Sequence, residues 1–267
     1  MKFYPPLFIG ICLFTSLLLS SCEKNDHKLN KGFQVELPDS DEGEDPNEPK
    51  LHLANFDTRP GPVINTAHPE HRITPVFKIN HDKKGRPFIG SIAYHKNYRN
   101  YYSDYDNDPG HFMPGLEAVY GFNLTNMAHH RLDSMSQNLL FKQAALIKTL
   151  YYPALQTDSI NDQPVIRDYY LVSAYDQDSN RDSIINWKDQ RHFYYFDLNG
   201  ENQSALVPLD YSVLNCRYDK SNDFMYVYAQ KDGNGNGKRE SDESIHIFWV
   251  DLKNPLRNGL FYSEEIQ

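Results

Sequence analysis

The chain has 267 residues and a formal net charge of −9; 39% of its residues are hydrophobic and 13% aromatic, including 19 tyrosines. This length fits one large domain or two small ones, and the aromatic composition favours β-structure. The acidic balance argues against a nucleic-acid ligand, because binding phosphates requires clustered Lys and Arg. An acidic surface instead suits cations.

The first 22 residues contain one basic residue, Lys2, followed by an apolar segment. The apolar run is too short for a stable membrane span and is typical of a signal peptide. It ends in Leu19-Ser-Ser-Cys22, which resembles the lipobox of bacterial lipoproteins. The resemblance implies that Cys22 is acylated and anchors the chain in the cell envelope, at the periplasmic or the surface face of the outer membrane. The alternative is an ordinary secretory signal with a coincidental cysteine.

Residues 23–50 have almost no periodic apolar positions, and the run from Pro38 to Pro49 is acidic and of low complexity. Such a composition cannot bury a core. We therefore expect residues 23–50 to be a flexible acidic tether, with a loose cation-binding tail as the alternative. Residues 51–267 are then the folded domain.

One pattern occurs twice in the C-terminal half. It consists of an aromatic-rich strand, an acidic loop of twelve residues, and a second strand that ends in Asp-Leu. The loops are Asp178–Asp189 and Asp232–Glu243, and the same offset of 54 residues separates His192 from His246. A fixed offset is typical of a duplicated structural unit. We expect each loop to join two paired antiparallel strands, both loops to lie at the same edge of adjacent sheets, and the two histidines to occupy a strand-packing position.

Further strand candidates extend the repeat into three units, at about 51–126, 138–199 and 204–252. The third unit has four short strands in about 50 residues, the size of one β-propeller blade. Val213–Leu252 is similar to a TolB-like propeller repeat, and His81–Tyr94 matches the hairpin part of that repeat. The resemblance implies an all-β fold of antiparallel, blade-like four-stranded repeats. Three blades are too few to close a ring, so we expect a propeller-like arrangement that is incomplete or open. Either the N-terminal region contains a further unit, copies pair between chains, or the fold is an open sandwich built from related hairpins.

One segment has helical periodicity. Between Met127 and about Ala145, apolar residues recur at approximate helical spacing; they are Leu132, Met135, Leu139 and Leu140. We expect at most one short helix there, although the apolar runs of this segment fit strands equally well.

Both twelve-residue loops carry oxygen ligands at the positions that calcium requires. In an EF-hand loop, positions 1, 3, 5, 9 and 12 supply side-chain oxygens and position 7 supplies its backbone carbonyl. In the first loop these positions are Asp178, Asn180, Asp182, Ile184, Asn186 and Asp189. In the second loop they are Asp232, Asn234, Asn236, Lys238, Glu240 and Glu243. Position 6, where the chain must turn sharply, is Ser183 in the first loop and Gly237 in the second.

The loops resemble EF-hand loops, and the first, with Asp at position 12, is similar to the dockerin variety. The flanking residues alternate as strands, so the helix–loop–helix frame is missing, and with it the opening motion of a calcium sensor. The resemblance implies that calcium has a structural role and stabilises long hairpin loops. The alternative is that loops rich in Asp, Asn and Gly are ordinary turns, but two complete matches at one point of a repeat favour calcium.

Other metal candidates are weaker. Asp104, Asp106 and Asp108 begin like a third calcium loop, but position 12 is Gly115. Two histidine pairs lack the spacing of a zinc helix motif; they are His68 with His71 and His129 with His130. The one cysteine of the folded domain, Cys216, lies in an apolar segment and is expected to be buried and inert.

These features predict an envelope-anchored, calcium-binding lipoprotein that acts as a binding or scaffold module for a protein or glycan ligand. The chain has no nucleophile elbow, phosphate loop or CxxC motif, so an enzyme is the less favoured interpretation. The alternative function is a glycan-active or other hydrolase whose calcium sites are structural. It would need two convergent carboxylates in a cleft away from the loops, one with a raised pKa. A purely structural envelope protein is a third interpretation.

Overall fold

The computed structural model describes residues 32–36, 52–53, 56–82, 84–89, 92–95 and 113–264. Within these residues every regular element is a β-strand, and every strand pair is antiparallel. The expected all-β fold is therefore confirmed. The described residues include no helix able to cross a membrane. Cys22, the signal segment, most of the predicted tether and Asp104–Asp108 lie outside the described residues.

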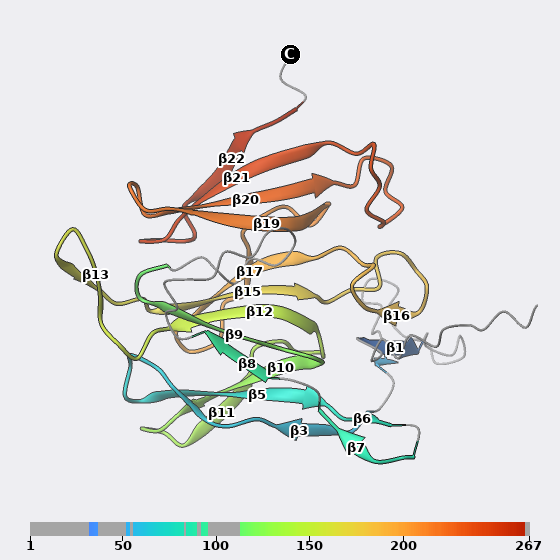
Figure 1. Ribbon diagram of the computed structural model, residues 1–267, viewed down its shortest axis with the longest axis horizontal. Helices are drawn as coiled ribbons and strands as arrows, with labels where there is room; N and C mark the ends of the chain where they lie inside the picture. Colours follow the sequence, from blue (N-terminus) through green and yellow to red (C-terminus); the bar gives the residue numbers. More distant parts are fainter. Residues whose placement is uncertain are drawn as a thin grey trace, which may run out of the picture.

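Three sheets are stacked on one another (Figure 1). The first has the order β11-β10-β5-β3, with β4 also paired to β5. Its strands are β3 (Thr58–Pro60), β4 (Ile64–Asn65), β5 (His71–Lys78), β10 (Leu124–Arg131) and β11 (Ser136–Leu139). One face of this sheet packs through Ile73, Phe77, Leu124 and Met127 into the first hydrophobic core.

The middle sheet has the order β18-β17-β15-β12-β9-β8. Its strands are β8 (Ile92–His95), β9 (Leu116–Gly121), β12 (Leu146–Pro153), β15 (Tyr169–Tyr175), β17 (His192–Asp197) and β18 (Ser204–Ala205). Every residue of β15 is buried. Tyr170 and Val172 enter the first core while Tyr169 and Leu171 enter the second. Because successive side chains of a strand point to opposite faces, a sheet covered on both sides needs this continuous apolar run.

The third sheet is a meander of four consecutive strands, β19-β20-β21-β22. These are β19 (Tyr211–Asp219), β20 (Phe224–Lys231), β21 (Ile245–Asp251) and β22 (Asn258–Tyr262). One face contributes Val213, Val227 and Val250 to the second core. The other face carries aromatic pairs, with ring centroids 5.3 Å apart for Phe224–Trp249 and 4.8 Å apart for Tyr226–Phe261. This sheet has the strand number and order expected of a blade.

Short strands complete the described structure. Two are hairpins: β6 (Asn80–His81) with β7 (Pro87–Phe88), and β13 (Asp158–Ile160) with β14 (Gln163–Val165). The remaining set is β1 (Phe33–Glu36), which pairs with both β2 (His52–Leu53) and β16 (Ile184–Ile185). The strand β1 corrects the tether prediction for these residues, because the Phe33 side chain is buried in a small cluster with Ile185 and Tyr175.

Two further expectations differ from the structure. The segment expected to be helical, between Met127 and Ala145, is the hairpin of β10 and β11. Leu132 and Met135 lie in its exposed turn, and Met135 has a φ of 52°, so the helical spacing is coincidental. The sheets also do not follow the expected units, because the chain leaves the middle sheet at Gly121 and enters the first sheet at Leu124.

A buried ion pair joins the third sheet to the middle one. The Arg167 guanidinium donates from Nη2 to Asp223 Oδ1 (2.8 Å), from Nη1 to the carbonyl of Leu252 (2.6 Å) and from Nε to the carbonyl of Pro114 (3.0 Å). The Tyr169 hydroxyl also donates to the Leu252 carbonyl (2.6 Å). Arg167 and Asp223 are both 3% exposed, so the charges compensate each other out of contact with water.

Candidate calcium-binding loops

Each candidate loop connects two neighbouring strands of its own sheet, the first in the middle sheet and the second in the third sheet. The first, Asp178–Asp189, joins β15 to β17, and the second, Asp232–Glu243, joins β20 to β21. Each flanking pair is antiparallel, with His192 opposite Ala174 in one and His246 opposite Ala229 in the other. The predicted placement of the loops between paired strands is therefore confirmed. Both loops project from the same side of the stack (Figure 1).

In the first loop, backbone amides donate to the side chains of the early predicted ligands. The Asp182 amide donates to Asp178 Oδ1 (3.0 Å) and to Asn180 Oδ1 (2.9 Å). The Ser183 amide donates to Asp178 Oδ2 (2.8 Å), and the Ile184 amide to Asp182 Oδ1 (3.0 Å). These bonds turn positions 1, 3 and 5 inward, since each side chain is held over the backbone of the loop.

The second loop has the same four hydrogen bonds at the same positions. The Asn236 amide donates to Asp232 Oδ1 (3.1 Å) and to Asn234 Oδ1 (2.9 Å). The Gly237 amide donates to Asp232 Oδ2 (2.8 Å), and the Lys238 amide to Asn236 Oδ1 (2.8 Å). The two loops have identical residues only at position 1, an aspartate, and at position 3, an asparagine. The common conformation therefore follows from the spacing of oxygen-bearing side chains.

The backbone dihedrals agree with this equivalence. Position 4 has a positive φ in both loops, 58° at Arg181 and 71° at Gly235, and so has position 6, 64° at Ser183 and 69° at Gly237. A left-handed conformation costs a residue with a Cβ about 1–2 kcal/mol. The first loop adopts it at two non-glycine positions, so the surrounding hydrogen bonds outweigh that cost.

Position 12 closes the first loop with a buried carboxylate. The Asp189 side chain is 0% exposed. Its Oδ2 accepts from the Asn186 amide (2.7 Å), and its Oδ1 accepts from the Asn180 amide and the Ser179 hydroxyl (both 3.4 Å). Burial raises the pKa of Asp189 to about 6, and the other two carboxylates of the loop add to the shift. Within the described residues no Lys or Arg forms an ion pair with this carboxylate.

Position 12 of the second loop is more open. Glu243 Oε2 accepts from the Glu240 amide (3.2 Å) and Oε1 from the Gly233 amide (3.1 Å). The Glu240 carboxylate at position 9 accepts from the side-chain amides of Asn234 (2.6 Å) and Asn236 (3.0 Å). The late predicted ligands of this loop thus lie beside the early ones.

The loop residues fit calcium in ligand type and in order, although their carboxylates are not drawn together. Across the described residues, no three His, Cys, Asp or Glu side chains form a group that could hold a metal ion. The predicted ligand set, however, also uses asparagine oxygens and a backbone carbonyl. A carboxylate oxygen that accepts one N–H bond keeps a lone pair for a cation. Asp178 Oδ1 and Asp232 Oδ1 each accept one such bond, so both loops keep ligand capacity at position 1.

The two loops also contact each other, which the sequence did not reveal. Two hydrogen bonds connect them, from Ser179 Oγ to Gly237 O (2.7 Å) and from Arg239 Nη2 to Trp187 O (3.0 Å). A third runs from Gln190 Nε2, just after the first loop, to Asp232 Oδ2 (2.8 Å). A Cβ at Gly237 would lie 1.9 Å from the Ser179 carbonyl oxygen. Glycine at this position therefore serves the contact between loops as well as the turn.

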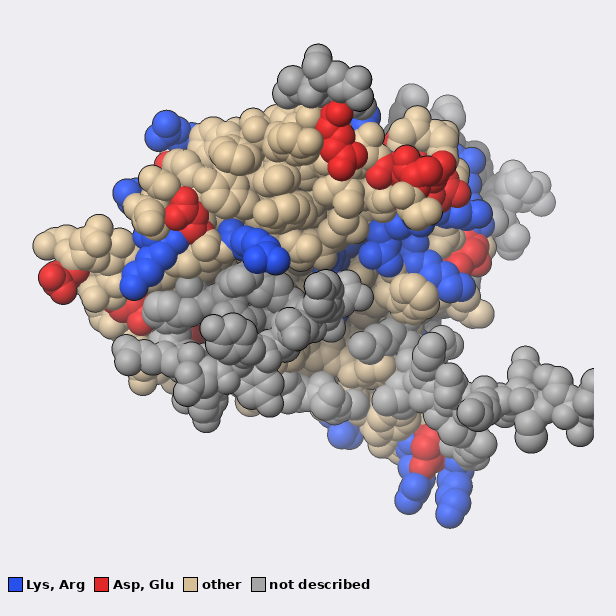
Figure 2. Space-filling view, turned by 45° about the horizontal axis from the view of Figure 1, so that its top comes forward, with Lys and Arg blue, Asp and Glu red and all other residues tan. Residues whose placement is uncertain are grey.

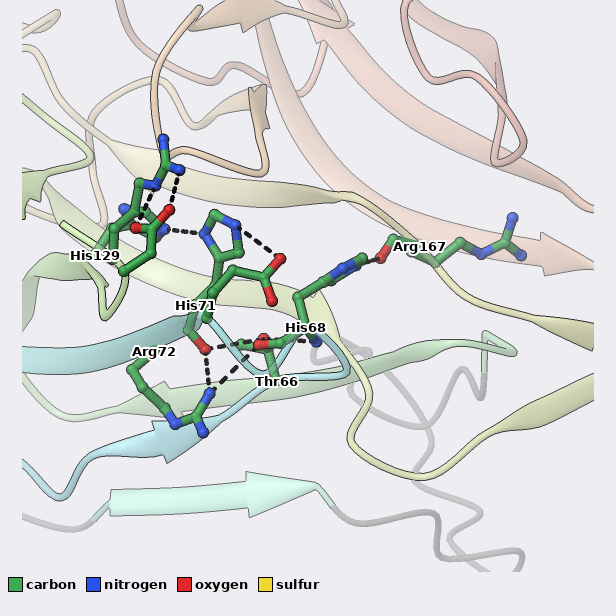
Figure 3. A network of polar contacts seen from close by, with 9 residues as sticks. Thr66, His68, His71, Arg72, His129 and Arg167 are labelled. Carbon is green, nitrogen blue, oxygen red and sulfur yellow. Dashed lines mark hydrogen bonds and ion pairs between the residues drawn. The ribbon is translucent and has the colours of Figure 1, made fainter.

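Three of the four histidines, His68, His71 and His129, make polar contacts within the protein (Figure 3). Within the described residues, His130 Nε2 is buried without a hydrogen-bond partner. His71 Nδ1 lies 2.9 Å from His129 Nε2, and His129 Nδ1 lies 3.0 Å from Asn138 Oδ1. Because that oxygen can only accept, His129 carries its proton on Nδ1 and accepts one from His71. The ring of His68 contacts the Arg167 carbonyl at 2.8 Å. Burial lowers the pKa of His71 and of His129, and both act as neutral packing residues.

His192 and His246 have the packing position that their common offset indicates. Both are buried, and each lies opposite an alanine of the neighbouring strand. His192 Nδ1 contacts Asp176 Oδ1 at 2.6 Å, and His246 Nδ1 contacts the Tyr211 hydroxyl at 2.8 Å. Cys216 is half-buried rather than buried, and it packs against the second core from β19.

No protein-family model matches the chain, and no curated protein matches it significantly. The resemblances to calcium loops and to propeller repeats therefore depend on the residues themselves.

Proposed function

We propose that this protein is a calcium-binding lipoprotein of the cell envelope that acts as a membrane-anchored binding or scaffold module. The observation that supports it best is the repetition of four hydrogen bonds and two positive φ values at identical positions of two loops 54 residues apart. Ordinary turns of different sequence would not be expected to share all of these features.

Calcium would supply positive charge where each loop gathers three predicted carboxylate ligands. In the first loop the cation would be held by Asp178, Asn180, Asp182, Ile184, Asn186 and Asp189, and in the second by Asp232, Asn234, Asn236, Lys238, Glu240 and Glu243. Because the loops connect strands of two adjacent sheets and are hydrogen-bonded to each other, fixing one loop constrains the other. The role proposed for calcium is to stabilise these long hairpin connections.

Calcium titration of the purified full-length chain tests this proposal. We expect binding of about two ions, one per loop, and a melting temperature that rises with calcium because the ion binds the folded state. Asp178→Asn combined with Asp232→Asn should abolish both effects. Asp242→Asn is the matched control, since it removes a carboxylate at position 11, which is not a ligand position. Identical melting curves in calcium and in chelator would show that the loops are only turns.

The membrane anchor rests on the Leu19-Ser-Ser-Cys22 sequence. Cys22→Ala should move the protein from the membrane fraction to the soluble fraction, because acylation of this cysteine is the proposed attachment. Unchanged fractionation of the variant would contradict the lipoprotein proposal and leave the calcium proposal intact.

The hydrolase alternative receives no support from three hollows of the described surface. They are lined around Trp187 and Arg239, around Thr149 and Cys216, and around Val63 and Met135. Together their linings contain one carboxylate, Asp182. A glycan hydrolase would use two, so none of these three hollows has the required pair.

A further inference from the structure

An open groove of about 550 Å³ lies between the two candidate calcium loops. Its lining comes from both loops and consists of Asn180, Asp182, Trp187, Lys188, Lys238 and Arg239. Three of these residues are also predicted calcium ligands, two through their side chains and Lys238 through its carbonyl. Any change in the loops therefore changes the walls of the groove.

Trp187 presents a large aromatic surface to the groove. It is 53% exposed, although Asn186 before it is buried and Asp189 shortly after it is fully buried. Its carbonyl accepts a hydrogen bond from Arg239 of the other loop. The backbone that carries the indole is thus fixed while the ring faces solvent. An exposed tryptophan on a fixed backbone is a typical anchor for a ligand.

The groove is also locally basic. Lys188, Lys238 and Arg239 are all exposed, and Asp182 is the one acidic residue of the lining. Although the chain is acidic overall, basic side chains gather in patches on the visible face of the molecule (Figure 2). Around the indole such cations favour an anionic ligand, and Arg can bind a carboxylate or a similar oxyanion through two N–H groups.

The charge of this region depends on calcium. The two loops together carry seven acidic and four basic side chains, a net charge of −3. Two bound dications would change it to +1. Without them, the carboxylates beside the groove oppose an anion, and with them the lysines and the arginine determine the local field.

We propose that the groove between the loops binds an acidic saccharide, a sugar bearing carboxylate or sulfate groups, and that calcium in the loops is required for this binding. The inference rests on the proposed calcium function and names the ligand class of the same site. A sugar ring can place its C–H face on the Trp187 indole while its anionic substituents reach Lys188, Lys238 and Arg239. An acidic peptide offers the charge without a rigid ring face, so it would use the cations alone.

Calorimetric titration of the full-length chain tests the proposal, with a chondroitin sulfate tetrasaccharide as the probe. We expect binding in excess calcium and none in EGTA, and no binding of the neutral tetrasaccharide cellotetraose. Trp187→Ala should weaken binding about tenfold or more, as expected for an aromatic anchor. Lys238→Gln and Arg239→Gln should each weaken it roughly threefold to tenfold, as for charges at the rim of a site.

Control variants remove similar groups elsewhere on the third sheet. Phe261→Ala deletes an exposed aromatic and Lys253→Gln an exposed cation, and neither should change the affinity. Calcium affinity is measured separately for every variant.

Equal affinity for tetraglutamate and for the tetrasaccharide would overturn the saccharide assignment. Unchanged saccharide binding by Trp187→Ala would show that the groove is not the binding site. Intact calcium binding without saccharide binding would refute this inference alone, whereas saccharide binding in a chain that binds no calcium would refute the calcium requirement and the proposed function.

Discussion

The two candidate calcium loops have the same local conformation in different surroundings. The first is part of the packed structure: β16 lies within it and pairs with β1, and Asp189 at position 12 is fully buried. The second contains no strand, its residues from Gly233 to Asn236 are exposed, and Glu243 at position 12 is half-buried. Local spacing thus determines the shape of a loop, and tertiary contacts determine how firmly it is held. The first loop should keep its shape without an ion, and the second should depend on calcium more strongly.

The largest effect is expected where the loops meet. Gly237→Ala would place a Cβ 1.9 Å from the Ser179 carbonyl oxygen, at a φ of 69°. Displacing that backbone and straining the alanine should lower the free energy of unfolding by about 3 kcal/mol. Gly235→Ala is the matched control, because its φ is 71° but nothing lies within 4 Å of the new Cβ; it should cost only about 1 kcal/mol. Urea denaturation measures both, and equal losses would show that the loops do not pack as described.

The next largest effect is the difference in stability between removing the position-12 carboxylate of the first loop and that of the second. In EGTA, Asp189→Ala should destabilise the protein by about 2 kcal/mol, because the buried amide of Asn186 loses its acceptor. Glu243→Ala should cost less, since the Gly233 amide it leaves lies in an exposed stretch. Urea denaturation in EGTA gives both values. A larger loss of stability for Glu243→Ala would contradict the conclusion that the first loop keeps its shape without an ion while the second depends on calcium.

Calcium should produce a smaller stabilisation with the opposite ranking. Extracellular sites often bind with dissociation constants of about 0.1–1 mM, so millimolar calcium should add about 1 kcal/mol per site. Glutamate at position 12 can reach the ion with both oxygens. Glu243→Gln should therefore lose a larger share of the calcium-dependent rise in melting temperature than Asp189→Asn. If the two variants lose the same share of the calcium-dependent rise in melting temperature, the two loops do not differ in their dependence on calcium.

Acid gives the smallest effect and serves as a reference outside the loops. The pKa values of His71 and His129 are lowered from 6.5, mainly by burial, with the charge of Arg131 adding to the effect and that of Glu70 opposing it at His71. Both rings are neutral in the folded protein but take up protons in the unfolded chain below pH 6.5. Their contribution to stability is thus complete above pH 6.5 and is lost as the pH falls through their folded pKa values, by about 1 kcal/mol or less at first. In EGTA, His129→Gln should flatten this part of the stability profile; an unchanged slope would place the acid sensitivity elsewhere.

Local features of the sequence predicted the all-β fold and the position of both loops between paired strands. The 54-residue offset was sufficient to predict that the two loops are equivalent, because the conformation of each loop depends on nearby oxygen-bearing side chains. Long-range pairing was not predictable in this way. Nothing local shows that Phe33 docks beside Ile185, that Ser179 bonds to Gly237, or that the chain changes sheets between Gly121 and Leu124. The helical spacing around Met135 failed for a related reason, since an exposed turn imposes no apolar period.

The Arg167–Asp223 pair constrains the order in which the chain can fold. Asp223 follows Arg167 by 56 residues, and the Leu252 carbonyl that shares the guanidinium follows later still. Until the third sheet forms, Arg167 has no carboxylate partner, and the face of the middle sheet that carries Tyr169, Leu171 and Phe193 remains exposed to water. Burial of that face therefore waits for the last fifth of the polypeptide. A chain cut short before Asp223 would not persist as a two-sheet core and would be open to proteolysis as an unfinished product.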